Sequence, residues 1–241
     1  MKLTFIGTSH GVPEPNRKCS SILLEAGGNA YFIDMGTPPV DALRRLGIGV
    51  ETVKAVFITH MHNDHTDGLI PFIGLMNWFF KKADPLICLP NMEVVPAIQS
   101  WIRLTESTPP RDIRYAQTQA GLVYDDGILQ VTAIPTMHCA NSFAYLVRGE
   151  GKTVLFTGDL KNPKIDFPSL EDVEQLDLLV CECAHFEAQD YLTAWKPEKL
   201  RKVCVTHFTD RRLPGILSLC KTLKEQGIEA LRATDDLQLH I

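Results

Sequence analysis

Three histidines and one aspartate occur within six consecutive residues, directly after an apolar run that predicts a buried strand. The run covers residues 53–59, and the four polar residues that follow are His60, His62, Asp64 and His65. Imidazole nitrogen and carboxylate oxygen bind zinc, iron or manganese, and side chains crowded at one strand end can converge on a cation. The chain has only eight histidines, so three of them in one turn are poorly explained by a solvated loop. The segment predicts a metal site.

Short apolar runs recur along the chain, and many of them end in glycine, aspartate or histidine. Runs rich in β-branched and aromatic residues predict strands, and longer apolar-periodic segments predict helices. The expected strands are residues 3–6, 21–25, 30–33, 53–59, 86–89, 129–134, 142–147, 153–157, 178–183 and 202–206. The expected helices are 38–46, 66–82, 92–104 and 214–226, with a less regular segment at 168–176. This mixture predicts an α/β (α+β) layered fold, with residues 1–241 forming a single domain.

Two pairs of segments resemble each other across the chain. Residues 54–60 and 201–207 each begin with a basic residue and end in Thr-His, and residues 31–36 resemble residues 154–159. Together the pairs suggest two sheets that deliver polar residues from their strand ends to a shared cleft. Residues 105–127, rich in proline, glycine and aspartate, are expected to form a surface excursion near that cleft.

Composition is that of an ordinary globular chain, with 45% apolar and 22% charged residues. The net charge of −5 argues against an extended basic surface for nucleic acid, but it is compatible with a small anionic or short nucleic-acid substrate. The longest apolar patch, residues 69–80, is too short to span a bilayer, and the first strand is too short for a secretory signal. The seven scattered cysteines fit reduced, buried thiols. We expect a cytoplasmic protein without membrane association.

Three further polar residues each end or follow an apolar strand. They are His138, Asp159 and His207. Taken singly, a strand-end histidine or an aspartate after glycine is usually a turn or capping residue. Their order after the first cluster favours metal ligation.

In that order the polar residues resemble the metallo-β-lactamase superfamily, with an HxHxDH signature and a match over nearly the whole sequence. The resemblance implies a four-layer αββα sandwich with a dinuclear metal site at the edge of two facing sheets. It implies two divalent ions, zinc or alternatively manganese or iron. By the family's pattern, one metal would be bound by His60, His62 and His138, the second by Asp64, His65 and His207, with Asp159 bridging.

A dinuclear site has a physical logic that agrees with this resemblance. Two cations about 3.5–4 Å apart lower the pKa of a bridging water and stabilise charge on the attacked group. Asp64 is expected to be catalytic as well as a ligand, because a carboxylate beside the cations stays ionised and can orient the nucleophile or accept its proton.

Within the superfamily the chain resembles the ribonuclease Z-like branch, which handles phosphodiesters. Four segments carry this resemblance: residues 7–13 with Arg17 and Ser20 following, 32–36, 182–186 and 206–211. The first is glycine-rich, and its exposed amides can approach a phosphate closely. The tRNA-processing enzymes carry a long arm that grips tRNA, and residues 139–158 leave no room for one.

His185 is the candidate for the branch's further proton-handling histidine, activated by Glu182 or another neighbour. The alternative, a surface or core-edge histidine after a strand, carries equal weight. The roles of His10, Arg211 and Arg212 stay open at this point, although either arginine, or Lys161, could neutralise phosphate charge.

These features predict a dinuclear metal-dependent phosphodiesterase that acts on a small or short phosphodiester through a metal-bridging hydroxide. A cyclic nucleotide or a short oligonucleotide would be such a substrate. The alternatives are a carboxylic ester, lactone or thioester hydrolase of the same fold, a tRNA 3′-end endonuclease, and a non-hydrolytic metal-binding or redox protein. A homodimer is compatible with the sequence.

Overall fold

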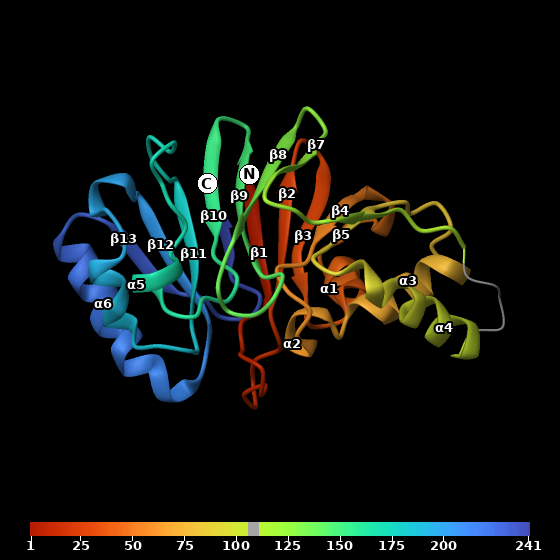
Figure 1. Cartoon of the computed structure of the whole chain (residues 1–241), viewed down its shortest axis with the longest axis horizontal. Coiled ribbons are helices and arrows are strands. Elements are labelled where there is room, and N and C mark those ends of the chain that lie inside the picture. Colours follow the sequence, from red (N-terminus) through yellow and green to blue (C-terminus); the bar gives the residue numbers. More distant parts are fainter. Residues whose placement is uncertain (106–110) are drawn as a thin grey trace.

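Two β-sheets lie face to face at the centre of the molecule, with helices on both outer sides (Figure 1). The structure is a computed structural model that describes residues 1–105 and 111–241. Each sheet contains seven strands among these residues. The layers therefore run helix, sheet, sheet, helix, which confirms the predicted αββα sandwich.

The first sheet has the strand order β14-β1-β2-β3-β4-β5-β6. Its strands are β1 Lys2–Gly7, β2 Ser21–Ala26, β3 Asn29–Met35, β4 Val53–Phe57, β5 Leu86–Leu89, β6 Tyr115–Gln117 and β14 Gln238–His240. Its helices are α1 Pro39–Arg45, α2 Asn63–Thr66, α3 Leu69–Trp78 and α4 Val95–Thr105, with 3₁₀ turns at Val50–Thr52 and Met92–Val94. Strands β3 to β6 run parallel to one another.

The second sheet has the strand order β13-β12-β11-β10-β9-β8-β7. Its strands are β7 Gly121–Asp125, β8 Leu129–Pro135, β9 Phe143–Gly149, β10 Lys152–Phe156, β11 Leu178–Cys183, β12 Lys202–Phe208 and β13 Glu229–Arg232. Its helices are α5 Pro163–Asp166 and α6 Leu213–Glu225, with 3₁₀ turns at Ala188–Thr193, Pro197–Lys199 and Asp210–Arg212. Strands β10 to β13 are parallel.

Three apolar cores hold the layers together. The middle core lies between the sheets, where Phe57 of β4 meets Tyr145 of β9 with ring centroids 5.7 Å apart. One outer core packs the first sheet against α1, α3 and α4, and the other packs the second sheet against α6. The central strands of both sheets are buried on both faces, which explains their near-continuous apolar sequences.

Parallel pairing places the ends of several strands at one edge of the sandwich. β3 and β4 end at Met35 and Phe57 in the first sheet, and β10, β11 and β12 end at Phe156, Cys183 and Phe208 in the second. Open α/β sheets present their ligand-binding loops at the carboxyl ends of parallel strands. The loops that carry the predicted metal-binding residues all leave this edge.

All ten expected strands and four of the five expected helical segments are present, with shifted ends. In the expected segment 66–82, Thr66 is the last residue of α2, and the main helix is the shorter α3, which begins after Gly68. The expected helix at 168–176 is wrong, because Leu170, Val173 and Leu176 are anchors of a turn that packs on the second sheet. That residues 1–241 form a single domain stays a prediction.

Most described residues of the expected surface excursion at 105–127 are exposed or half-buried, but the segment is not an irregular loop. Residues 106–110 lie outside the described residues, and the remainder includes edge strands β6 and β7, which pair with β5 and β8. These strands, like β13 and β14, are short and carry little sequence signal. Within residues 1–105 and 111–241, none of the helices combines the length and apolar character needed to cross a membrane.

A close backbone contact fixes the HxHxDH turn against the end of β3. A Cβ atom on Gly36 would lie 1.7 Å from the carbonyl oxygen of Asp64. Because no side chain fits in that space, glycine at this position allows the two loops to pack together. The metal-site turn is thus positioned by the loop that follows the neighbouring strand.

We predict that Gly36→Ala lowers the free energy of unfolding by about 3 kcal/mol or more, since the loops must separate to admit a methyl group. Urea denaturation followed by circular dichroism measures the loss. Gly49→Ala is the matched control, because its Cβ would lie 3.4 Å from the nearest atom, a flexible side chain, and we expect a change below about 1 kcal/mol. Equal losses for both variants would contradict the role given to the close contact.

Candidate metal centre

The HxHxDH turn begins three residues after the end of β4 and continues into α2. His60 and His65 are buried, Asp64 is half-buried and His62 is exposed. His62 caps the N-terminus of α2 with an extended backbone, so that the helix starts between the second and third polar residues of the motif. The change from strand to helix within this turn brings all four side chains to one side of the sheet edge.

Three imidazoles form the first cluster. His60 Nε2 lies 3.0 Å from His62 Nδ1, and His138 Nε2 lies 3.2 Å from the same nitrogen. His138 comes from the loop between β8 and β9 of the second sheet. The three ring nitrogens lie within 4.8 Å of one another, a spacing at which one cation can contact all of them.

The second cluster combines a carboxylate with two imidazoles. His65 Nε2 and His207 Nε2 lie 3.4 Å and 3.7 Å from Asp64 Oδ2. His207 is the penultimate residue of β12, and its φ of 45° is a left-handed conformation that costs energy for a residue with a side chain. That backbone conformation holds the imidazole at the sheet edge.

Asp159 lies between the two clusters. Its Oδ2 is 3.7 Å from Nε2 of His60, 3.7 Å from Nε2 of His138 and 3.3 Å from Nε2 of His207. Its Oδ1 is 3.5 Å from Nε2 of His65. The structure therefore brings together all seven predicted metal-binding residues, with one carboxylate in contact range of members of both clusters.

The donor set fits divalent cations. His65 Nε2 and Asp159 Oδ1 are buried, and neither has a hydrogen-bond partner among the described residues. Unpaired buried polar atoms are costly, and a cation between them would satisfy both. Nitrogen and carboxylate oxygen are ligands for zinc, manganese and iron.

The charges of the buried carboxylates also favour a cation between the two clusters. Burial lowers the pKa of His60 to about 2, so its ring is neutral and keeps a lone pair for a cation. Although burial opposes it, His207 and His65 hold the pKa of Asp159 well below its usual range. Despite burial, Asp159 and Asp34 raise the pKa of His65, which shows that the carboxylates stabilise a positive charge there.

Asp34 orients His65 from behind. The buried Asp34 carboxylate accepts hydrogen bonds from Nδ1 of His65 at 2.7 Å, the backbone N–H of Thr59 at 2.7 Å and the Thr59 hydroxyl at 2.9 Å. Bonding at Nδ1 leaves Nε2 as the atom that faces the cluster. Sequence reasoning placed Asp34 in a resembling segment but gave it no role. The available signal was an aspartate at the end of a strand, one residue before the Met35-Gly36 turn.

Asp166 ties together the loops of two other site residues. Its carboxylate accepts hydrogen bonds from the backbone N–H groups of Met137 at 2.8 Å, Lys161 at 2.9 Å and Asn162 at 3.1 Å. Met137 immediately precedes His138, and Lys161 follows Asp159 by two residues. Asp166 therefore fixes the relative position of two loops of the second sheet.

His185 lies beside the clusters and is hydrogen-bonded to a buried carboxylate. Its Nδ1 is 2.9 Å from Oε1 of Glu182, and this bond raises the pKa of His185 to about 9. Glu182 is held by the backbone N–H groups of Leu160 and Ala184, both at 2.8 Å. His185 Nδ1 also lies 3.8 Å from Asp159 Oδ2. The histidine is protonated at neutral pH, partly exposed and at the site.

The first loop, residues 8–20 between β1 and β2, lines the other side of the site. A Cβ on Gly11 would make ordinary contact with the Asp64 carboxylate at 3.5 Å, and burial together with the nearby His207 lowers the pKa of His10. Arg17 donates hydrogen bonds to the carbonyl of Phe208 and to Asp210, both at 2.8 Å. Arg17 thus anchors this loop to the end of β12.

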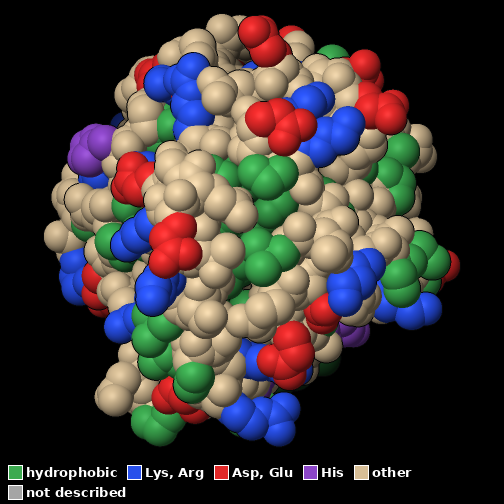
Figure 2. Space-filling model, turned by 90° about the vertical axis from the view of Figure 1, so that its left-hand side faces the viewer, with side chains coloured by type: hydrophobic (Ala, Val, Ile, Leu, Met, Phe, Trp, Pro, Cys, Tyr) green, Lys and Arg blue, Asp and Glu red, His purple; other side chains and the backbone are tan. Residues whose placement is uncertain are grey.

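The remaining predicted basic residues lie at the periphery. Arg211 is exposed, and Arg212 pairs with Glu187. On the face that carries α6, lysine and arginine side chains alternate with acidic ones and do not gather in one patch (Figure 2). That face offers no extended basic surface.

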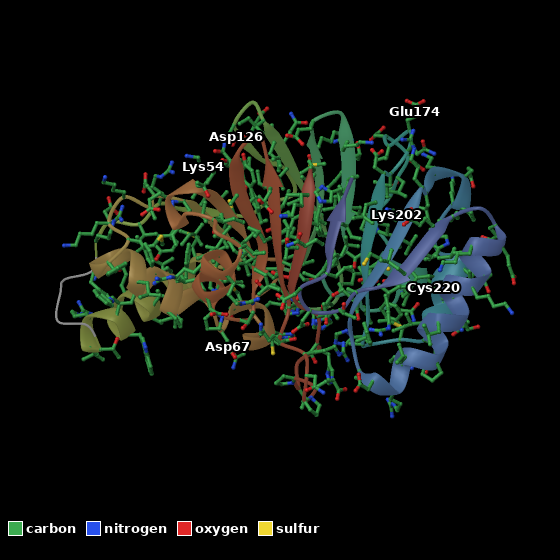
Figure 3. The ribbon with its side chains drawn as sticks, turned by 180° about the vertical axis from the view of Figure 1, so that it is seen from behind. Lys54, Asp67, Asp126, Glu174, Lys202 and Cys220 are labelled. Atoms are coloured by element: carbon green, nitrogen blue, oxygen red, sulfur yellow. The ribbon has the colours of Figure 1, made fainter. Side chains whose placement is uncertain are left out.

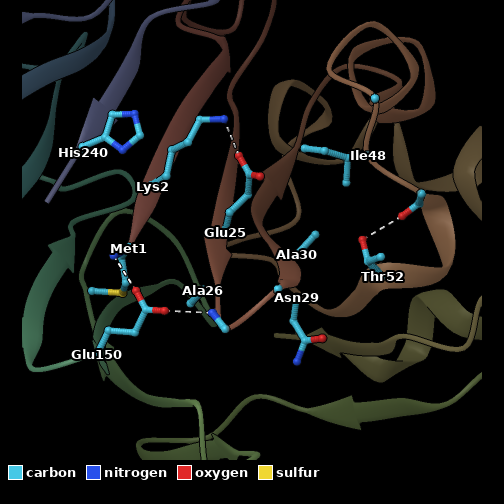
Figure 4. Close-up of a pocket in the computed structure, with 14 residues that line it drawn as sticks. Met1, Lys2, Glu25, Ala26, Asn29, Ala30, Ile48, Thr52, Glu150 and His240 are labelled. Atoms are coloured by element: carbon cyan, nitrogen blue, oxygen red, sulfur yellow. Dashed lines mark hydrogen bonds and ion pairs between the residues drawn. The ribbon is translucent and has the colours of Figure 1, made fainter.

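A separate pocket of about 460 Å³ lies at the start of β1 and is not part of the clusters (Figure 4). His240 and the Lys2–Glu25 ion pair, 2.8 Å long, line it together with Glu150, which binds the amino group of Met1 at 2.6 Å. Its charged groups are paired with one another, and none of the predicted site residues reaches it.

One family model and several curated proteins are similar to this chain in sequence. Residues 1–98 match a family model described as Anti-Pycsar protein Apyc1. Ribonuclease Z of Picosynechococcus sp. is 31% identical over 153 residues, which cover 61% of this chain and 47% of the relative. The chain thus spans about half the length of the curated relatives it matches.

Two solved structures share the fold over essentially the whole chain. The short form of human tRNase Z has a TM-score of 0.76 at 21% identity, covering 100% of this chain and 99% of the other. A diphosphatase of the PhnP family has a TM-score of 0.71 at 18% identity, with coverage of 100% and 97%. A metallo-β-lactamase-fold protein from Bacillus subtilis shares the sandwich as well, with a TM-score of 0.75 at 20% identity and coverage of 99% and 98%.

We predict that Asp34→Asn weakens binding of a divalent cation about 10- to 100-fold, because an amide orients the His65 imidazole less firmly. Titration calorimetry with zinc or manganese measures the affinity. Asp41→Asn is the control, since the Asp41 side chain on α1 is 75% exposed. Unchanged affinity in Asp34→Asn would contradict its positioning role.

Proposed function

We propose that this chain, which is similar in sequence to ribonuclease Z and in fold to metallo-β-lactamase-fold structures, is a dinuclear metal-dependent phosphodiesterase acting on a small or short phosphodiester. A cyclic nucleotide and a short oligonucleotide are the substrates that this proposal names. The observation that carries it is the position of Asp159, whose carboxylate reaches members of both clusters.

The proposed ligand assignment follows the two clusters. One cation would be held by His60, His62 and His138, and the second by Asp64, His65 and His207, with Asp159 shared. Zinc is the proposed metal, with manganese and iron as alternatives for the same nitrogen and oxygen donors. When bound, two such cations supply Lewis acidity that lowers the pKa of water and neutralises charge on a phosphodiester.

Two side chains of the site are suited to proton transfer. Asp64 is held ionised, because its hydrogen bond with His65 and the charge of His207 outweigh the effect of burial and keep its pKa below the usual range. Asp64 would orient the attacking water or accept its proton. His185 is protonated at neutral pH through Glu182, so it would donate a proton to the leaving oxygen.

Several observations support a phosphodiester over an acyl substrate. The first loop lies against Asp64 and presents a glycine-rich backbone there, and the sequence relatives are named ribonuclease Z. Lys161 is exposed two residues after Asp159, so it could bind phosphate.

The segment between His138 and Asp159 argues for a substrate smaller than precursor tRNA. Residues 139–142 form a turn, and the rest of the segment is the hairpin of β9 and β10. No residue there is left for an arm. We place the activity in the cytoplasm, where reducing conditions suit the chain's seven free cysteines.

We predict that the metal-loaded protein hydrolyses bis-para-nitrophenyl phosphate, cyclic nucleotides or short RNA faster than a panel of lactones, thioesters and carboxylic esters. Chelation should abolish turnover.

His62→Ala should lower metal affinity and turnover by about 100-fold or more, because it removes a direct ligand. Turnover confined to the acyl panel would favour the alternative hydrolase. Redox-active iron with no hydrolysis of either panel would overturn the proposal.

We predict that His185→Ala lowers kcat by about 10²-fold or more for substrates with an alkoxide leaving group, because these need a general acid. The loss should be much smaller for a para-nitrophenyl leaving group, which departs without protonation. Steady-state kinetics on both substrate types, with metal content checked, measures this difference. His240→Ala, far from the clusters, is the matched histidine control. Equal losses on both leaving groups would contradict a proton-donor role.

A further inference from the structure

The end of β12 departs from regular strand pairing at the position of a predicted metal ligand. Cys181 of β11 pairs with Val205 of β12. Two residues later on β11, Cys183 pairs with Phe208, which lies three residues later on β12, so the register shifts by one residue. His207 lies in this irregularity and has a φ of 45°. A bulge re-aims a side chain, and left-handed backbone persists only where surrounding contacts impose it.

The His207 ring is not oriented through its Nδ1 atom. This nitrogen is buried and has no hydrogen-bond partner within the described part of the chain. By contrast, Nδ1 of His65 is held by Asp34 at 2.7 Å. Metal-binding imidazoles are normally oriented through the ring nitrogen that faces away from the metal. At His207 the backbone and its neighbours must set the direction of the ring instead.

Arg17 holds the residue that follows His207 from two directions. Its guanidinium carbon lies 4.1 Å from the centroid of the Phe208 ring, and one Nη atom donates a hydrogen bond to the Phe208 carbonyl at 2.8 Å. The same nitrogen donates to Asp210 at 2.8 Å, and the other Nη donates to the Thr8 carbonyl at 3.1 Å. The Phe208 side chain is itself buried in the outer core of the second sheet. Arg17 thus clamps the ring and the carbonyl group next to the bulge.

The guanidinium of Arg17 is committed to the protein and not to a substrate. Its side chain is only 10% exposed, and two backbone carbonyls and one carboxylate already accept its hydrogen bonds. The first loop, which carries Arg17, extends below both sheets in two opposite views (Figures 1 and 3). Figure 3 shows Asp67, which directly follows α2, at the same lower edge. The clamp therefore lies at the edge where the metal clusters form.

We propose that Arg17 is a positioning residue for the second cation site, because its hold on Phe208 directs the His207 imidazole toward the carboxylates. This inference rests on the proposed dinuclear function. His207 Nε2 lies 3.7 Å from Asp64 Oδ2 and 3.3 Å from Asp159 Oδ2. The three imidazoles of the first cluster come from other loops. Loss of the clamp therefore displaces a ligand of the second cation and leaves the ligands of the first in place.

The contacts require an arginine at this position. A guanidinium is planar, so it can stack on an aromatic ring and donate several hydrogen bonds at its edge. The ammonium group of lysine is a compact point charge that cannot make all of these contacts together. Arg17→Lys keeps the positive charge but loses the clamp, and it is therefore a sharper test than removal of the side chain.

Calorimetric titration of zinc into the metal-free full chain tests the proposal. We expect two cations per unmodified chain. In Arg17→Ala and Arg17→Lys we expect the affinity for the first cation to stay within about 3-fold, and that for the second to fall about 10- to 100-fold. Circular dichroism establishes that each variant is folded.

Arg201→Ala is the matched control for these titrations. Arg201 also pairs with a carboxylate, that of Asp177 at 3.1 Å, but it is 58% exposed. It precedes Lys202 at the opposite end of β12 from Phe208, and Figure 3 shows Lys202 above the lower edge of the molecule. Both zinc affinities should be unchanged in this variant.

Steady-state kinetics on bis-para-nitrophenyl phosphate separate positioning from substrate binding. With zinc limiting, Arg17→Ala should have a lowered kcat and an unchanged KM, and raising the zinc concentration should restore kcat by filling the second site. Added guanidinium ion should partly restore the second zinc affinity in Arg17→Ala, where it can occupy the space left by the side chain.

The outcomes distinguish this inference from the proposed function. Two unchanged zinc affinities in Arg17→Ala, equal weakening of both cations, or a raised KM with normal metal content would each overturn the role given to Arg17. An unmodified chain that binds two cations but hydrolyses no ester would overturn the proposed function alone, since the zinc titrations still decide the role of Arg17. An unmodified chain that binds one cation or none would overturn both.

Discussion

The position of the Asp159 carboxylate is the constraint on which the rest of the site depends. It is buried at the edge between the two sheets, within 3.8 Å of nitrogens from residues of both sheets. A buried carboxylate without partners would take up a proton, so its surroundings must supply positive charge. His207 and His65 do so in part, and cations would complete the neutralisation. The sandwich brings these groups together because both sheets end their parallel strands at the same edge.

A second set of carboxylates holds the site without facing the clusters. Asp34 orients His65, Asp166 joins two loops of the second sheet, and Glu182 fixes His185. Each accepts hydrogen bonds from backbone N–H groups as well, so the loops cannot shift without losing several bonds. Rigid loops of this kind keep metal-binding side chains in one geometry, which is what tight and selective binding needs.

Much of the fold followed from local sequence patterns, and the misses have physical reasons. The buried strands were predicted because an apolar run between turn residues has few alternatives to a strand buried on both faces. Edge strands such as β6 and β14 were missed, since their three residues are held by pairing with a neighbour more than by their own composition. The false helix at 168–176 arose because an apolar spacing of three residues also occurs in a turn anchored on a sheet.

The sequence by itself predicted the donor set of the candidate centre, because the seven histidines and aspartates of its motif order lie together in the structure. Their positions could be recognised in the sequence, because these residues follow the apolar runs that predict strands. Only the tertiary structure decided which groups support them. The pairing of Asp34 with His65 and of Glu182 with His185 depends on contacts between elements. Such contacts leave no periodic pattern in the chain, because they arise only when separate strands and loops pack at one edge.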